Sequence, residues 1–97
     1  MPLSFTPHGA TYDPTTDLMR FFATDGALLV RCGVSKNALL ALDPELPREA
    51  RMIARLYERN RQRIEAIADR KYRARHLDKS GMVIVHFSDL RAKAGDS

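Results

Sequence analysis

The chain has 97 residues, 44% of them hydrophobic and 29% charged, which suits one folded domain and excludes an intrinsically disordered chain. Its apolar runs are too short to cross a membrane, and its single cysteine and the lack of a secretory signal favour a cytoplasmic protein. The formal net charge of +4 is uneven, because residues 48–79 hold eleven Lys and Arg against five Asp and Glu.

The N-terminal third predicts β-structure. Leu3–Thr6 is typical of a short strand, and residues 8–16 are rich in Gly, Pro and Thr and predict a loop. Leu18–Thr24 and Ala27–Val34 are β-rich runs joined by Asp25-Gly26, the preferred pair for a two-residue type I′ turn. This turn sets a register whose apolar face pairs Ala23 with Leu28, Phe21 with Val30, and Met19 with Cys32.

The rest of the chain predicts two helices and a last strand. Ser35 is a natural N-cap for a short helix over Lys36–Leu42. Pro47 suits the first turn of a long helix that runs to about Tyr72, and Met82–Phe87 predicts a buried strand. The order β-β-β-α-α-β predicts a two-layer α+β fold, a small antiparallel sheet with one long and one short helix packed on one face. We expect residues 1–90 to form this domain and residues 91–97 to be a disordered tail.

The long helix divides into two faces at 100° per residue. The apolar arc, which we expect to pack on the hairpin, holds Ile53, Leu56, Tyr57, Asn60, Ile64 and Ile67. The opposite arc is basic and holds Arg48, Arg51, Arg55, Arg59, Arg63, Arg70 and Arg73. This basic arc is either a solvated surface or a contact for an anionic partner. In the second case the candidates for contact with a nucleic-acid backbone are Arg51, Arg55, Arg59, Arg63 and Arg70.

The other face of the hairpin carries two unusual pairs. The predicted register places Arg20 opposite Arg31, where like charges repel, so either Asp17 or Asp89 neutralises them or the site receives an anion. The same register pairs Phe22 with Leu29. These two side chains form an apolar interface patch unless the preceding loop or the short helix covers them.

No catalytic constellation is visible in the sequence. Cys32 is predicted to point inward from a strand, and the three histidines are scattered without metal-ligand spacing. Asp13, Asp17 and His86 are the residues around which an enzyme would have to be built, but no partner is spaced to assist them. We therefore expect no catalytic residue, no cofactor and no metal site.

Several short motifs resemble one known family. They are Leu3-x-Phe5, Tyr12-Asp13, Phe21 ahead of Asp25-Gly26, Cys32-x-Val34-Ser35-x-x-Ala38-Leu39, Asn60-Arg61-x-x-Ile64, and Tyr72. Together they resemble the bacterial "domain of unknown function 1488" family from Leu3 to about Phe87. The resemblance implies a compact α+β domain with an antiparallel sheet, and it brings no catalytic residues. The basic run Arg73–Lys79 departs from the family pattern.

These observations predict a non-enzymatic cytoplasmic accessory or protein-interaction module. Its partner would be another protein or a second copy of the chain, bound through the apolar strand surface. The alternative is weak, non-sequence-specific binding of nucleic acid through the basic helix face. Neither interpretation involves a membrane.

Overall fold

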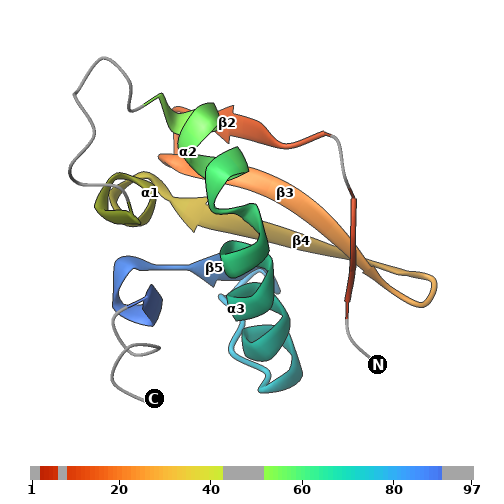
Figure 1. Ribbon diagram of the computed structural model, residues 1–97. Coiled ribbons are helices and arrows are strands. Elements are labelled where there is room, and N and C mark those ends of the chain that lie inside the picture. Colours follow the sequence, from red (N-terminus) through yellow and green to blue (C-terminus); the bar gives the residue numbers. More distant parts are fainter. Residues whose placement is uncertain (1–2, 7–8, 43–51, 91–97) are drawn as a thin grey trace.

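The computed structural model describes residues 3–6, 9–42 and 52–90. It shows one sheet with helices on one face, so the predicted two-layer α+β fold is confirmed (Figure 1). Four features of the sequence interpretation lie outside the described residues. They are the helix start at Pro47, the basic-arc residue Arg48, the candidate contact Arg51 and the expected tail at residues 91–97.

The sheet has five strands and is mixed rather than purely antiparallel. The strands are β1 (Ser4–Phe5), β2 (Thr11–Asp13), β3 (Leu18–Asp25), β4 (Leu28–Ser35) and β5 (Val83–Val85). Both β1 and β2 pair with β3, and β4 lies between β3 and β5. The prediction of an all-antiparallel sheet was wrong for β5, which runs parallel to β4. The chain crosses over through the helices between these two strands, and such a crossover returns it in the same direction.

The hairpin forms with a register two residues away from the predicted one. The turn residues are Gly26 and Ala27, because Asp25 pairs with Leu28. Gly26 has a φ of 61°, the conformation that favours glycine at the first turn position. A shift of two residues keeps each side chain on its face, so Met19, Phe21 and Ala23 remain buried as expected.

The shifted register changes the cross-strand partners on the other face. Arg20 pairs with Gly33, and Phe22 pairs with Arg31. The predicted pairs Arg20–Arg31 and Phe22–Leu29 were therefore wrong, and the members of each pair are diagonal neighbours instead. This removes the direct like-charge opposition between the two arginines.

The short helix α1 (Lys36–Leu42) has the predicted bounds, and the Ala38 amide donates to the Ser35 hydroxyl at 3.1 Å. The predicted long helix is interrupted and forms α2 (Ile53–Arg59) and α3 (Arg61–Arg73). Between them Asn60 has φ −112° and ψ 16°, and its side-chain amide donates to the Leu56 carbonyl at 2.9 Å. This bond competes with the helical backbone for the same carbonyl, which is how asparagine disfavours a helix interior.

The core lies between the sheet and the helices. Leu56, Tyr57, Ile64 and Ile67 are buried, which confirms the predicted apolar arc for these four residues, while Ile53 and Asn60 are partly buried. The Tyr57 ring packs against Phe21 with their centroids 5.4 Å apart. α2 and α3 lie across one face of the sheet, and no helix of the described residues covers the opposite face of β3, β4 and β5, which is called the open face below (Figure 1).

Candidate functional site

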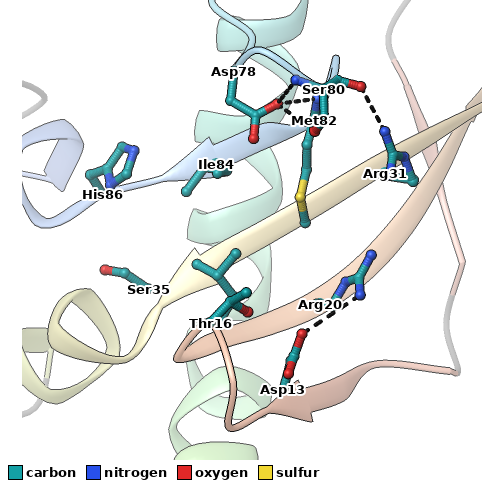
Figure 2. A pocket seen from close by; sticks show the side chains of 11 residues that line it. Asp13, Thr16, Arg20, Arg31, Ser35, Asp78, Ser80, Met82, Ile84 and His86 are labelled. Carbon is teal, nitrogen blue, oxygen red and sulfur yellow. Dashed lines mark hydrogen bonds and ion pairs between the residues drawn. The ribbon is translucent and has the colours of Figure 1, made fainter.

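The open face of the sheet carries a broad hollow of about 540 Å³ (Figure 2). Its walls come from the segment after β2, from the outward side chains of β3 and β4, and from the loop that leads into β5. The hollow is lined by Asp13, Thr16, Leu18, Arg20, Arg31, Ser35, Asp78, Ser80, Met82, Ile84 and His86. It therefore combines charged groups with an apolar floor.

Strand alternation explains how these residues come together. Leu18 and Arg20 project outward from β3, while the Met19 side chain between them enters the core. Gly33 lies in the middle of the floor on β4, where an added Cβ would be 3.0 Å from the Met82 Cε and 3.4 Å from the Leu18 Cδ1. Because glycine has no side chain, the Met82 and Leu18 side chains pack over this strand.

Arg20 has an acidic neighbour within the hollow. Its Nη1 lies 3.7 Å from Oδ2 of Asp13, and Figure 2 shows the two side chains facing each other. The pKa of Asp13 is lowered, first by the Thr15 amide that donates to its carboxylate. The predicted neutralisers Asp17 and Asp89 were wrong: Asp17 accepts the Tyr12 hydroxyl at 2.6 Å, and Asp89 pairs with Lys71.

Arg31 is exposed and, unlike Arg20, it forms no ion pair with a carboxylate of the described residues. Its Nη2 donates to the Ser80 carbonyl at 2.6 Å, and within residues 3–6, 9–42 and 52–90 no carboxylate forms an ion pair with it. Asp78 is close by, but its Oδ1 accepts hydrogen bonds from the Met82 amide and from the amide and hydroxyl of Ser80. The Met82 amide is the main cause of the lowered pKa of Asp78. These hydrogen bonds hold Oδ1 of Asp78 within its own loop, so Arg31 retains most of its five N–H donors for a ligand.

The two apolar candidates differ in exposure. Leu29 is 63% exposed, and Phe22 is half-buried beside the segment around β2. Both project from the open face next to the arginines, and neither belongs to the hydrophobic core between the sheet and the helices. Their role in an interface stays a prediction.

The basic arc lies on the opposite side of the molecule from the hollow. Arg55, Arg59, Arg63 and Arg70 are exposed on α2 and α3. On the same helices Arg61 pairs with Glu65 at 2.7 Å and Arg73 pairs with Asp69 at 2.8 Å. Contact with nucleic acid through this arc also stays a prediction.

Cys32 lies in the hydrophobic core and does not line the hollow. The Cys32 side chain is 1% exposed, and burial raises the pKa of its thiol to about 12. Within the part of the chain that the structure describes, no three His, Cys, Asp or Glu side chains are grouped so as to hold a metal ion. The same part contains no helix with the length and hydropathy needed to span a membrane.

A hydrogen-bond network around Lys71 was missed by the sequence analysis. The Lys71 ammonium donates to the Ile84 carbonyl and to Oδ2 of Asp89, both at 2.7 Å. The same carboxylate oxygen accepts the His86 amide at 2.7 Å. The network joins α3 to the edge strand β5 and to the helical turn at residues 87–90. From the sequence Lys71 was one of several cations near a helix C-terminus, and nothing distinguished it from its neighbours.

Comparisons with known proteins agree with this architecture. Residues 3–85 match the family model described as "Protein of unknown function (DUF1488)". A comparison with curated proteins finds no match. The fold is similar to the crystal structure of a DUF1488 protein of unknown function from Shewanella loihica PV-4, with a TM-score of 0.76 and 23% identity over 87% of this chain and 91% of that one. The chain belongs to the DUF1488 family.

Proposed function

We propose that this protein is a non-enzymatic, cytoplasmic protein-interaction module. Its docking surface is the open sheet face, and its partner is a segment of another protein that carries carboxylate and apolar side chains. The observation that carries the proposal is the exposed Arg31 guanidinium, which forms no ion pair with a carboxylate of the described residues, although the nearby Asp78 offsets part of its charge. The lone cysteine favours the reducing cytoplasm.

Charge complementarity selects the acidic partner. A guanidinium offers a planar fork of N–H donors that matches a carboxylate, and such a pair is stronger than a neutral hydrogen bond. Arg20 lies on the neighbouring strand and shares the hollow, with its side chain 39% exposed. Its ion pair with Asp13 is long at 3.7 Å, so a better-placed carboxylate can compete for it. Both arginines therefore favour an anionic group in the hollow.

Apolar contacts around the arginines supply the rest of the surface. Leu18, Met82 and Ile84 line the floor, and Leu29 and Phe22 extend the apolar surface along the hairpin. A side chain that is 63% exposed, as Leu29 is, gains free energy when a partner removes it from water. Interfaces of this kind join an apolar centre to charged groups that fix orientation.

The acidic groups of the hollow support a binding role over catalysis. Asp13 and Asp78 have lowered pKa values because backbone amides donate to their carboxylates. A general base works best with a pKa near the working pH, so these carboxylates are weak candidates for proton transfer. Weak nucleic-acid binding through the basic helix face is the second candidate function, favoured by its exposed arginines.

Chemical-shift mapping by NMR tests the proposal. The probe is a short peptide of glutamate and valine residues, with its glutamine counterpart as the control ligand. We expect the acidic peptide to shift the amides of Leu29, Arg31 and Ile84, and Arg31→Gln to weaken the effect while Arg63→Gln leaves it unchanged. Shifts confined to the helix face, or equal binding of the glutamine peptide, would contradict the proposal. A mass that doubles with protein concentration, lost on Leu29→Ser, would instead identify a second copy as the occupant.

A further inference from the structure

We propose that the helix face opposite the sheet binds the phosphate backbone of nucleic acid, as a second surface that is independent of the hollow. The surface, called the arginine stripe, consists of Arg55, Arg59, Arg63 and Arg70 on α2 and α3. All four side chains are exposed. The proposal does not rest on the docking function of the sheet face, because the two surfaces lie on opposite sides of the molecule.

The spacing of the stripe suits a linear polyanion. Residues four apart on a helix are separated by about 6 Å along the axis, which holds for Arg55 and Arg59 on α2, and Arg63 and Arg70 on α3 lie about 10 Å apart along theirs. At about 100° per residue, the two members of each pair differ by about 40° or less in direction around their own helix. The stripe therefore consists of two rows of cations, one on each side of the break at Asn60.

The acidic neighbours of the stripe are largely engaged elsewhere. Glu65 pairs with Arg61, and Asp69 accepts both Arg73 and the Leu3 amide. Glu58 is exposed and offsets one positive charge. Among the described side chains none forms an ion pair with Arg55, Arg63 or Arg70. Three guanidinium groups thus remain available to replace the counterions of phosphates.

The break between α2 and α3 adds a polar recess to the stripe. A hollow of about 540 Å³ lies at this break and is lined by Glu58, Arg59, Asn60, Arg61, Gln62 and Arg63. No large apolar side chain takes part in the lining. Such a recess suits a hydrated phosphate better than an apolar ligand.

The same surface is poorly suited to a membrane. Peripheral helices bind lipid by inserting large apolar side chains, but those of α2 and α3 are buried or partly buried against the core. Between the arginines the exposed side chains include Ala54, Gln62 and Ala66. The stripe also lacks aromatic side chains for base stacking, so we expect weak binding with little sequence preference.

Fluorescence anisotropy of a labelled single-stranded oligonucleotide tests this inference. Three to four phosphate contacts predict a slope of log K against log salt of about −2 to −3, or roughly a 20- to 50-fold loss of affinity between about 50 and 200 mM salt. The double variant Arg63→Gln/Arg70→Gln should weaken binding about tenfold and reduce the magnitude of the slope by about 1.4. The control Lys36→Gln/Lys79→Gln removes the same charge from exposed positions outside the stripe and should retain binding.

Three results would overturn the inference. The first is no binding by the unaltered protein at the lowest salt. The second is an equal loss of affinity in the stripe variant and the lysine control, which would reduce the effect to net charge. The third is arginine-dependent binding to phosphatidylserine vesicles without binding to the oligonucleotide. Acidic-peptide binding at the sheet face should be unchanged in the stripe variant, which keeps the two proposals separable.

Discussion

Replacing Arg75 by glycine should stabilise the protein, because Arg75 has a left-handed backbone. It follows Ala74, the C-cap of α3, and has a φ of 64°. The Arg75 amide donates to the Tyr72 carbonyl at 3.0 Å and the His76 amide to the Lys71 carbonyl at 2.9 Å. These two bonds define a Schellman motif, in which the residue after the C-cap is most often glycine.

The magnitude follows from two opposing terms. A non-glycine residue in the left-handed region costs roughly 1–2 kcal/mol, because its Cβ crowds the following carbonyl. Glycine removes this cost but increases the conformational entropy of the unfolded chain, which reduces the gain in stability by about 0.4–1 kcal/mol. The net gain for Arg75→Gly is about 0.5–1 kcal/mol, or a rise in Tm of roughly 2–8 °C for a domain of this size.

Urea unfolding followed by circular dichroism measures this gain. We expect a higher midpoint with an unchanged m-value. Arg75→Ala removes the same charge but keeps the Cβ, so it should give no gain. Ala74→Gly places glycine at a φ of −85° and should destabilise by about 0.5–1 kcal/mol. A stability of Arg75→Gly equal to or below that of Arg75→Ala would refute the assignment of backbone strain to this position.

Three further predictions concern the β5 edge and the core. Lys71→Met should lower the free energy of unfolding in urea by about 1–3 kcal/mol, because it removes the ammonium that the Asp89 carboxylate and the Ile84 carbonyl contact. Lys36→Met should have little effect. Burial raises the pKa of Asp89, but the hydrogen bonds from Lys71 and His86 outweigh it and leave this pKa below its ordinary value. Stability should therefore fall as the pH drops below about 4, and this fall should be smaller in Lys71→Met; an identical pH profile would argue against the pair. Because the pKa of Cys32 is raised to about 12, the native thiol should resist Ellman's reagent at pH 8 and react only in denaturant, and rapid native reaction would contradict its burial.

The sequence predicted those parts of the fold that rest on local chemistry. Ser35 as a cap, the bounds of α1 and the buried arc from Leu56 to Ile67 depend on patterns within one segment, and all were confirmed. The alternation of the hairpin also held, because the observed register differs from the predicted one by an even number of residues.

The errors concern choices that only tertiary contacts decide. Both Asp25-Gly26 and Gly26-Ala27 offer a glycine for the turn, and the packing of the whole hairpin selects the second. β2 has three residues and no strong β pattern, so its pairing with β3 was not visible. The direction of β5 depends on the crossover rather than on its own residues.

The candidate site was only partly visible for the same reason. The sequence singled out Arg20 and Arg31 as a possible anion site, and the structure brings both into one hollow. It could not show that Asp13 faces Arg20, because this contact depends on the pairing of β2 with β3. It also could not show that the loop at Asp78 returns over β4, because Arg31 and Ser80 are 49 residues apart along the chain.

The affinity of an acidic peptide for the Arg31→Gln variant decides whether the open sheet face recognises a carboxylate. Isothermal titration calorimetry would compare this variant with the unaltered protein and with Arg63→Gln, which removes the same charge from the opposite side of the molecule. We expect that Arg31→Gln weakens binding about tenfold, or roughly 1.4 kcal/mol, while Arg63→Gln leaves it unchanged. Equal affinity of all three proteins would show that the open sheet face does not recognise the carboxylate.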